Sequence, residues 1–420
     1  MLLGYCILSV IFVLISIKYY SVFLNPVSIY SFVWIFAILI HQSGLIYYNE
    51  LLPRTWIFII VSYIFFCGFS LMHKPHSFPE ITSVKDDRHI VKKYLIITLL
   101  IASLGILSSI VNIVSIYGTN LLYNLTNIYA ARVYDDVDFQ VIPYVGSFIY
   151  IALPLAGIYI RRYGVSIWVM YAFVLVALNS LTSGARAGIV FSLLLFVYGY
   201  ALSGNNSIIR VKRKSNKIGL YIGSLILAAF FVIVSQSRAA GNQLPYATDM
   251  FYRYFGDNAL LYKLFAYVAN PIGVLNEYLK ECDFYFGKNT FLPIYNIIAK
   301  FGVIDRIDQY QSWYSVPADC NVGTWLRELV EDFTWFGAII AVSIYSYITS
   351  KVYIKSVKLN KTSSIIISSI LLMMVTLSFF DWKLRTSGLW IALIFGNVIG
   401  NKIDRHNLQV NNGRYPDSKL

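Results

Sequence analysis

The sequence predicts an all-α fold, a polytopic integral membrane helix bundle of about 11 spans with one long outer-face loop that contains short helices. The first observation is composition: the 420 residues are 58% hydrophobic and 13% charged, whereas soluble domains carry about 25% charged residues. The second is a mean hydropathy of +0.63. The third is that apolar stretches recur along the chain and are interrupted by one long polar stretch, residues 236–331.

Each predicted span has close to the length of about 20 apolar residues that a bilayer requires. The stretches are 2–20, 27–47, 55–72, 94–116, 142–160, 165–183, 187–203, 218–235, 333–350, 362–380 and 386–402. They divide the chain into four predicted parts. These are an N-terminal transmembrane bundle of about 8 spans (1–235), a long extracytoplasmic loop (236–331), C-terminal spans (332–402) and a cytoplasmic tail (403–420).

The basic residues predict the orientation of the spans. Lys and Arg concentrate in alternate connections, namely 73–93, 161–162, 203–217, 351–361 and the tail after 402. Short loops rich in Lys and Arg face the cytoplasm. We therefore expect residues 236–331 and the N-terminus on the outer side.

The same distribution explains the net charge of +13. In a membrane protein this excess marks cytoplasmic loops and contact with anionic lipid. Membrane lipids are thus expected partners, and no nucleic acid partner is predicted.

The long outer loop has local patterns of its own. Apolar residues at helical spacing over 260–268 predict an amphipathic helix that Pro271 ends or kinks. Residues 291–301 predict a second short helix. Cys282 and Cys320 could form a disulfide if the loop faces an oxidising space.

Arg186 is the first candidate for binding an anion. It lies in the outer turn Thr182–Gly188, at the start of a helix, with Ser183 and glycines beside it. A cation at a helix N-terminus is unfavourable by about 0.3–1 kcal/mol. A bound anion held by the arginine, free N–H groups and hydroxyls would offset that cost. The alternative is an arginine that extends to the membrane surface.

Other outer-side arginines are further candidates for binding pyrophosphate. Arg385 precedes the last span, although Asp381 could neutralise it. Arg132 is followed by three aspartates, so a local ion pair is the alternative. Arg238 follows a span at its C-terminal end, where the helix dipole favours a cation. Arg253 lies within the long loop.

The run Asn321–Asp332 leads from the long loop into a span and carries the candidate catalytic residues. Arg327 and Glu331 are four residues apart, so they share a helix face and could pair. Glu328 points elsewhere. Asp332 at the start of the span suits the helix dipole, and any of the three carboxylates could act as a general base toward a hydroxyl.

Metal and cofactor chemistry is not predicted. His41 is the one histidine near the outer end of a span, and the long loop has none. A histidine-liganded metal centre on the outer side is therefore not expected. No phosphate-binding loop, dinucleotide fingerprint or nucleophile elbow occurs in its structural context. We predict no cofactor and no metal.

Three features together resemble the Wzy-type oligosaccharide repeat-unit polymerases, also called O-antigen or capsule polymerases. The first is Asn25-Pro26 followed by an apolar run that contains Trp34. The second is Ser183–Gly188 between two central spans. The third is the segment before the ninth span, with Thr324, Arg327, Asp332 and Gly337.

The resemblance implies a membrane glycosyltransferase of the bacterial inner membrane. Such enzymes join repeat units carried on polyprenyl pyrophosphate, on the outer face of the membrane, to make O-antigen or capsular polysaccharide. A hydroxyl of the new unit attacks, and the lipid pyrophosphate of the growing chain leaves. The lipid-linked oligosaccharide is the implied partner, and a chain-length regulator protein is an open candidate for another.

Three other classes remain as alternatives. O-antigen ligases resemble these polymerases but are credited with an outer-loop histidine, which this long loop lacks. A lipid-linked oligosaccharide flippase or transporter would place ionisable residues within spans and repeat its halves. Here the predicted spans are almost free of charge, and no halves match. A receptor or assembly protein would not need arginines at several outer helix ends.

The predicted orientation can be measured with reporter fusions. We expect reporters at Asn206 and Asn360 to be cytoplasmic and a reporter at Asn289 to be external, because basic short loops stay inside. An external signal at Asn206 would reverse the orientation and the side on which the candidate site lies.

Overall fold

The computed structural model describes residues 1–73, 87–134, 137, 139–183, 187–204, 244–307 and 311–411. Within them the regular secondary structure is helical apart from one two-stranded sheet and an isolated bridge between Ile46 and Ala247, which confirms the all-α prediction. The chain forms two compact units. The described residues of the first unit come from 1–75, 241–351 and 374–387, and those of the second from 76–240, 352–373 and 388–420.

Several helices are apolar, as expected of a membrane protein. Among the described residues, those long and apolar enough to cross a bilayer are α1 (Leu2–Tyr20), α3 (Pro53–Ser70), α4 (Arg88–Tyr117) and α13 (Trp325–Leu359). Shorter apolar helices are α2 (Pro26–Gln42), α7 (Ile167–Ser183), α8 (Ala187–Leu202) and α14 (Thr362–Thr376). The predicted span 218–235 lies outside the described residues, and the total of about eleven stays a prediction.

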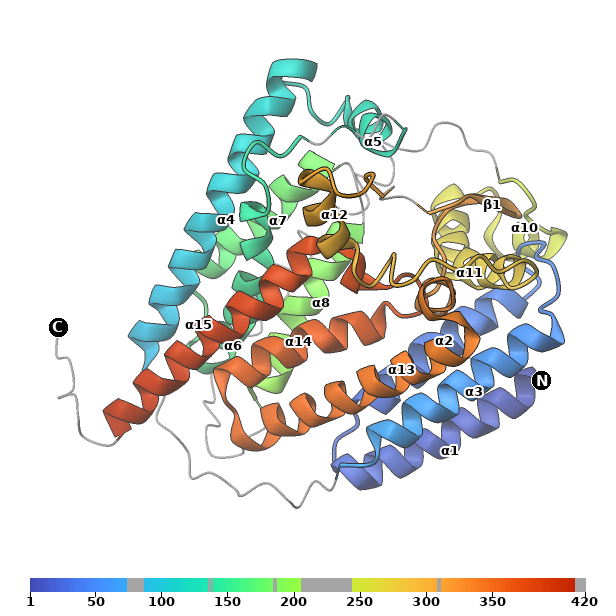
Figure 1. Ribbon diagram of the computed structural model, residues 1–420, viewed down its shortest axis with the longest axis horizontal. Helices are drawn as coiled ribbons and strands as arrows, with labels where there is room; N and C mark the ends of the chain where they lie inside the picture. The colour runs from blue at the N-terminus through green and yellow to red at the C-terminus, as the bar shows by residue number, and fades with distance from the viewer. Residues whose placement is uncertain are drawn as a thin grey trace. The chain divides into compact units, whose positions relative to one another are not determined.

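In the first unit, α1, α2 and α3 run side by side, with α13 next to them (Figure 1). Asn25 begins α2 as its N-cap: its side chain accepts the Ser28 N–H at 3.0 Å, and Pro26 follows at the first helical position. Both residues favour a helix start. Sequence alone therefore fixes where α2 begins.

Hydrogen bonds join these helices at the end where α1 finishes. The Tyr20 hydroxyl donates to the Ser70 carbonyl at 2.6 Å and lies 2.7 Å from Ser350 Oγ. Ser350 Oγ also donates to the Ser70 carbonyl. Three helices, α1, α3 and α13, are thereby fixed to one another by polar groups buried away from solvent.

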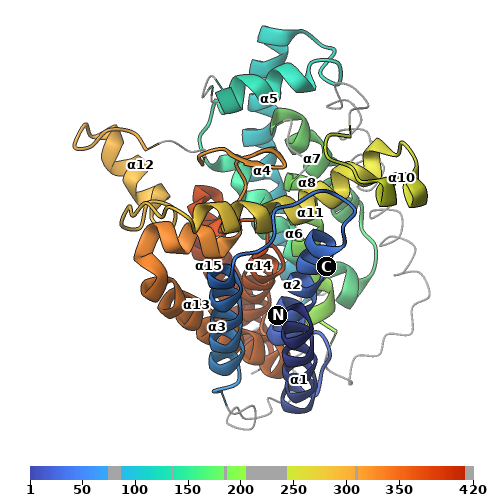
Figure 2. The same ribbon diagram turned by 90° about the vertical axis from the view of Figure 1, so that its right-hand side faces the viewer.

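The described part of the long loop belongs to this same unit and covers the opposite ends of its helices. It contains α10 (Asp249–Phe255), α11 (Ala259–Tyr278), α12 (Leu292–Lys300) and an antiparallel hairpin of β1 (Tyr314–Val316) and β2 (Ala318–Cys320). Figure 2 shows α11 crossing the ends of α2 and α3. Asn276 of α11 accepts the Leu52 N–H at 2.9 Å and the Thr55 hydroxyl at 2.8 Å.

Two expectations about this loop are confirmed, and of the two effects expected of Pro271, an end or a kink, the end is wrong. Helices occur over 260–268 and within 291–301, as predicted. Pro271, however, does not end its helix, since α11 continues to Tyr278 with Pro271 buried inside it. Packing of α11 against α2 outweighs the backbone hydrogen bond that a proline removes. Cys282 and Cys320 are free thiols and do not form a disulfide.

An aromatic cluster forms the core of the first unit beneath the loop. Trp325, fully buried at the start of α13, contacts Tyr30, Phe66, Tyr345 and Trp382, with ring centroids 5.4–5.9 Å apart. Burying rings of this size contributes most of the apolar stabilisation of such a core. The first turn of α13 therefore has a fixed position.

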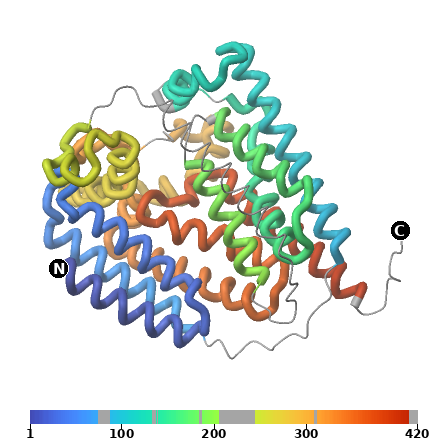
Figure 3. Tube along the Cα trace, turned by 180° about the vertical axis from the view of Figure 1, so that it is seen from behind, coloured from blue at the N-terminus to red at the C-terminus, as the bar shows by residue number. Residues whose placement is uncertain are grey.

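The second unit also consists of packed helices. Besides α4, α7 and α8, it contains α5 (Leu125–Tyr134), η2 (Val145–Phe148), α6 (Ile149–Tyr163), most of α14 and most of α15 (Ser387–Asn411). Figure 3 shows the cyan and green helices α4, α6, α7 and α8 against one another. Helices α6 and α8 pack closely, since a Cβ on Gly157 would lie 2.3 Å from the Phe196 carbonyl oxygen.

Gly157 can be tested for its role in this packing. We expect Gly157→Ala to lower the melting temperature of the purified protein in detergent, because the new methyl group forces α6 and α8 apart at a cost of about 1–3 kcal/mol. The matched control is Gly68→Ala in α3, where nothing lies within 4 Å of the new carbon. Equal melting temperatures for the two variants would contradict the close contact.

Candidate functional site

The structure brings five of the predicted site residues together in the first unit. Arg327, Glu328, Glu331 and Asp332 lie in the first turns of α13, and Arg385 lies in η3 (Lys383–Arg385), which follows α14. All four residues of α13 are at most 6% exposed. A helix break at Thr334, where φ is 64°, separates them from the apolar remainder of α13.

Arg253 and Arg132, the other predicted arginines that the structure describes, are not part of this group. Arg253 is exposed on α10, and Arg132 lies on α5 in the second unit. Arg186 and Arg238 are outside the described residues, and Ser183 is described only as the last residue of α7. Their proposed roles stay predictions.

Local sequence explains how the first turn of α13 is formed. Thr324 caps the helix, since its hydroxyl accepts the Arg327 N–H at 3.3 Å. The Trp325 N–H donates to the Ser378 carbonyl at 2.9 Å, and Ser378 Oγ in turn accepts the indole N–H of Trp34 at 2.8 Å. Trp34 of α2 thus helps to hold the start of α13.

Arg327 is held between two aromatic rings. Its guanidinium carbon lies 5.2 Å from the ring centre of Tyr278 and 5.3 Å from that of Tyr314, and one nitrogen donates to Gln311. The side chain is 1% exposed, and its Nε has no hydrogen-bond partner. A Cβ at Gly323 would lie 2.4 Å from Arg327 Cδ, so only glycine leaves room for the side chain.

No carboxylate of the described residues forms a salt bridge with Arg327. The expected pair with Glu331 is therefore wrong. Glu331 instead lies 3.3 Å from the Lys288 ammonium and accepts the Asn289 amide at 3.0 Å. Oppositely charged residues four apart pair on a helix face that is open to solvent. The face of α13 that carries Glu331 is instead covered by the loop before α12, which supplies Lys288 and Asn289 as partners.

Glu328 is the buried carboxylate that faces η3. It accepts the Trp382 N–H at 3.2 Å, and its Oε1 lies 3.7 Å from Arg385 Nη1. Asp381 pairs with Lys383 rather than with Arg385, so the expected Asp381–Arg385 pair is also wrong. Burial lowers the pKa of Lys383, while Asp381 opposes that shift.

Asp332 fastens the loop before α12 to α13. One carboxylate oxygen accepts the Asn289 N–H at 2.7 Å and the Asn289 side-chain amide at 3.1 Å. The other accepts the Thr290 N–H at 2.7 Å and the Thr290 hydroxyl at 2.6 Å. With four donors on two oxygens, Asp332 has a structural task whatever else it does.

This arrangement can hold an anion at the N-terminal end of α13. Charged side chains at the ends of apolar helices are costly to bury and mark functional sites by default. Arg327 has an unused donor, and Arg385 and Lys383 add positive charge close to Glu328. Because Arg327 is 1% exposed, a ligand can reach it only after a covering side chain such as Tyr314 or Gln311 moves.

Sequence reasoning missed the residues that surround Arg327. Tyr278, Tyr314 and Gln311 carried no distinguishing pattern, because they come from different parts of the loop. Asn289 and Thr290, which donate to Asp332, also stand in no recognisable sequence pattern. Within the described ranges, no group of three or more His, Cys, Asp or Glu residues could hold a metal ion.

Comparison of the chain with protein-family models, with curated proteins and with solved structures finds no match. The function is therefore inferred from the residues and their geometry.

The structural task of Asp332 predicts the effect of replacing it. We expect Asp332→Asn to destabilise the protein by about 1–3 kcal/mol, because an amide NH₂ would face donors that the carboxylate now satisfies. Thermal unfolding in detergent measures this. Asp319→Asn, on the exposed face of β2, is the matched control and should unfold like the wild type. An unchanged unfolding curve for Asp332→Asn would contradict the fastening role.

Proposed function

We propose that this protein is a membrane glycosyltransferase that polymerises oligosaccharide repeat units carried on polyprenyl pyrophosphate. The products would be O-antigen or capsular polysaccharide, made on the outer face of the bacterial inner membrane. The proposal is supported by the resemblance carried by Asn25-Pro26, Ser183–Gly188 and Asn321–Gly337 and by the apolar helices of both units.

The observation that carries the proposal is the environment of Arg327. A buried guanidinium held between Tyr278 and Tyr314, without a carboxylate partner among the described residues, is set to meet an anion. It lies where a loop of mixed polarity meets an apolar helix. A substrate with a lipid tail, a pyrophosphate and a glycan has the same order of apolar, anionic and polar parts.

The reaction in this proposal is a displacement at the anomeric carbon of the growing chain. A hydroxyl of the incoming lipid-linked unit attacks that carbon, and the bond from the carbon to the pyrophosphate oxygen breaks. The polyprenyl pyrophosphate leaves with the bonding electrons, and a carboxylate takes the hydroxyl proton. The step uses no metal and no cofactor.

Arg327 is assigned to the leaving pyrophosphate, with Arg385 supporting it. Forked guanidinium groups bind phosphate oxygens in pairs, and they stabilise charge that develops as a group leaves. Among the three carboxylates, Asp332 and Glu331 are occupied by loop residues. Glu328 also has partners, the Trp382 N–H at 3.2 Å and Arg385 Nη1 at 3.7 Å, but both lie in or next to η3, which supplies the second pyrophosphate-binding arginine, so we place the base there.

A gene deletion would separate this function from its alternatives. Under the proposal, glycan displayed on a gel should shrink to single repeat units. Loss of attachment with long chains retained would indicate a ligase. Accumulation of lipid-linked units on the cytoplasmic side would indicate a flippase.

Arg327 gives the sharpest biochemical prediction. With purified protein and lipid-linked substrate, we expect Arg327→Ala to lower the rate of chain extension by about 10²–10³, the typical cost of removing one donor that acts in the transition state. Arg327→Lys should also lose most activity, since lysine keeps the charge but not the fork.

The matched control is Arg54→Lys, an exposed arginine at the start of α3 in the same unit. It should extend glycan at the wild-type rate. A fully active Arg327→Ala enzyme would remove Arg327 from the proposal and leave Arg186 and Arg385 as the pyrophosphate candidates.

A further inference from the structure

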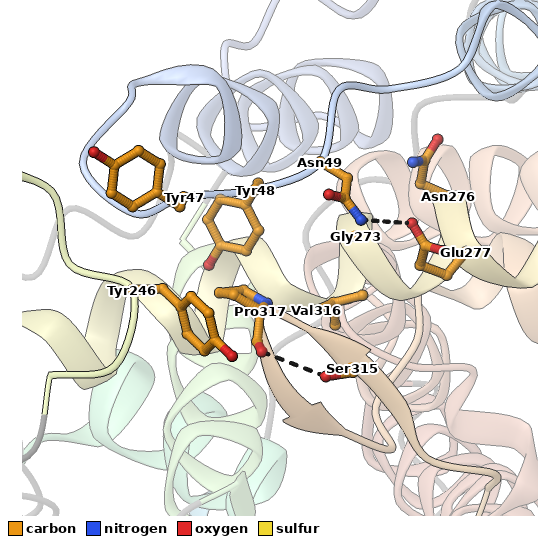
Figure 4. Close-up of a pocket in the computed structure, with 10 residues that line it drawn as sticks. All are labelled: Tyr47, Tyr48, Asn49, Tyr246, Gly273, Asn276, Glu277, Ser315, Val316 and Pro317. Atoms are coloured by element: carbon orange, nitrogen blue, oxygen red, sulfur yellow. Dashed lines mark hydrogen bonds between the residues drawn. The ribbon is translucent and has the colours of Figure 1, made fainter.

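A pocket of about 380 Å³ lies in the first unit, outside the charged group at the start of α13. It is formed by the segment that joins α2 to α3, by the chain before α10, by α11 and by the β1–β2 hairpin (Figure 4). Its volume falls in the range of about 300–1,000 Å³ that is usual for small-molecule sites. None of the residues assigned to the proposed reaction lines this pocket.

The lining of the pocket combines aromatic rings with uncharged polar groups. Tyr47, Tyr48 and Tyr246 contribute rings, and Tyr47 and Tyr246 are 64% and 55% exposed. Asn49 and Ser315 add an amide and a hydroxyl. Flat rings beside hydrogen-bonding groups match a sugar, which has apolar C–H faces and a rim of hydroxyls.

The charge of the lining argues against an anionic ligand. Glu277 is the one charged residue among those that line the pocket, and it accepts the Asn49 amide at 3.1 Å. Lys280 pairs with the same carboxylate from outside the lining. A phosphate here would meet a carboxylate and no free cation, so a neutral ligand is favoured.

The walls of the pocket are held in place before any ligand binds. The Tyr48 ring stacks on His41 with centroids 4.4 Å apart, and its hydroxyl donates to Asn270 at 2.7 Å. The Tyr47 N–H donates to the Tyr246 carbonyl at 2.9 Å. The Tyr48 ring and the backbone that carries the Tyr47 and Tyr246 rings are thus ordered in advance, which lowers the entropy lost on binding a ligand.

Tyr246 has an unfavourable backbone conformation. Its φ is 67°, in the left-handed region that a tyrosine rarely adopts. Strain of this kind persists where the surrounding structure imposes it, and it concentrates at binding and catalytic sites. This backbone conformation places the exposed ring of Tyr246, which lies just before α10, at the pocket beside the hairpin.

The pocket and Arg327 share two walls. On α11, Glu277 lines the pocket and the next residue, Tyr278, lies against the Arg327 guanidinium. On the hairpin, Ser315 lines the pocket and the preceding residue, Tyr314, covers Arg327. The two places are therefore neighbours along both elements, although successive residues of a strand point to opposite faces, so that Tyr314 and Ser315 face different sides of the hairpin.

We propose that this pocket binds a neutral sugar residue of the lipid-linked glycan, apart from its pyrophosphate. The identity of the glycan rests on the proposed function. The expectation that the pocket binds a neutral sugar rests on the residues that line it. Tyr47 and Tyr246 stack on the sugar, and Asn49 and Ser315 hydrogen-bond to its hydroxyls. Arg327 meets the anionic part of the same class of substrate.

The test uses calorimetry on the full-length protein in detergent with two separate probes. The first is the oligosaccharide released by mild acid from the lipid-linked glycan of the source cells, which carries neither lipid nor pyrophosphate. The second is inorganic pyrophosphate. The pocket variant is Tyr246→Gly, which removes the ring and is compatible with the positive φ, so its fold is retained. Tyr254→Ala, an exposed tyrosine of α10 outside the pocket, is the matched control.

We expect the released oligosaccharide to bind about tenfold more weakly to Tyr246→Gly, and with wild-type affinity to Tyr254→Ala and Arg327→Ala. No binding to the wild type, or equal binding to Tyr246→Gly, would overturn the proposal. Inorganic pyrophosphate should bind Tyr246→Gly normally and Arg327→Ala weakly. If only the pyrophosphate result fails, the role of Arg327 is wrong while the sugar pocket stands.

Discussion

The four hydrogen bonds that Asp332 accepts are the contact on which the rest of the candidate site depends. They join the residues before α12 to the first turns of α13, and backbone bonds from Tyr285 and Gly287 to the carbonyls of Glu331 and Asp332 extend the same seam. Thr290 then accepts the Trp382 indole N–H at 2.9 Å, which ties in the segment that carries Arg385. A buried carboxylate is tolerated here because each of its oxygens meets two donors.

Arg327 shows the complementary solution for a buried cation. Two tyrosine rings replace part of its hydration, and cation–π contacts gain strength where water is excluded. A carboxylate partner would neutralise the guanidinium, whereas rings leave its charge available. The first two turns of α13 thus carry a buried carboxylate with a donor on each lone-pair site it uses, Asp332, and a cation, Arg327, with one N–H still unpaired.

The sequence was sufficient to predict apolar helices and the polar, capped entry to α13, because both follow from local rules that apply within short windows. Neither α5 nor α10 was predicted, and the cap at Asn25 was identified only in the structure. The partners of Glu331 and Arg385 could not be predicted. They depend on how a long loop folds back over a helix end, and spacing along one helix does not contain that information.

The β1–β2 hairpin shows the same limit. Its turn is formed at Pro317 and carries none of the Asn-Gly or Asp-Gly signals that mark short hairpins. At Pro271 the local propensity indicated an end or a kink of the helix. The helix α11 continues through it, because packing against α2 outweighs that propensity. Arg186 and Arg238, the other leading candidates, lie outside the described residues, so the candidate site was predicted in part only.

The division of the first unit among three separated stretches of chain has a consequence for biosynthesis. The Tyr20 hydroxyl and the Ser70 carbonyl leave the ribosome early, yet their partner Ser350 is translated only after all the helices from α4 to α12. Until then, the polar groups at the adjoining ends of α1 and α3 lack their final partner. The first unit can therefore be completed only late in synthesis, when α13 has been made, and wrong pairing of the early helices has to be avoided until that point.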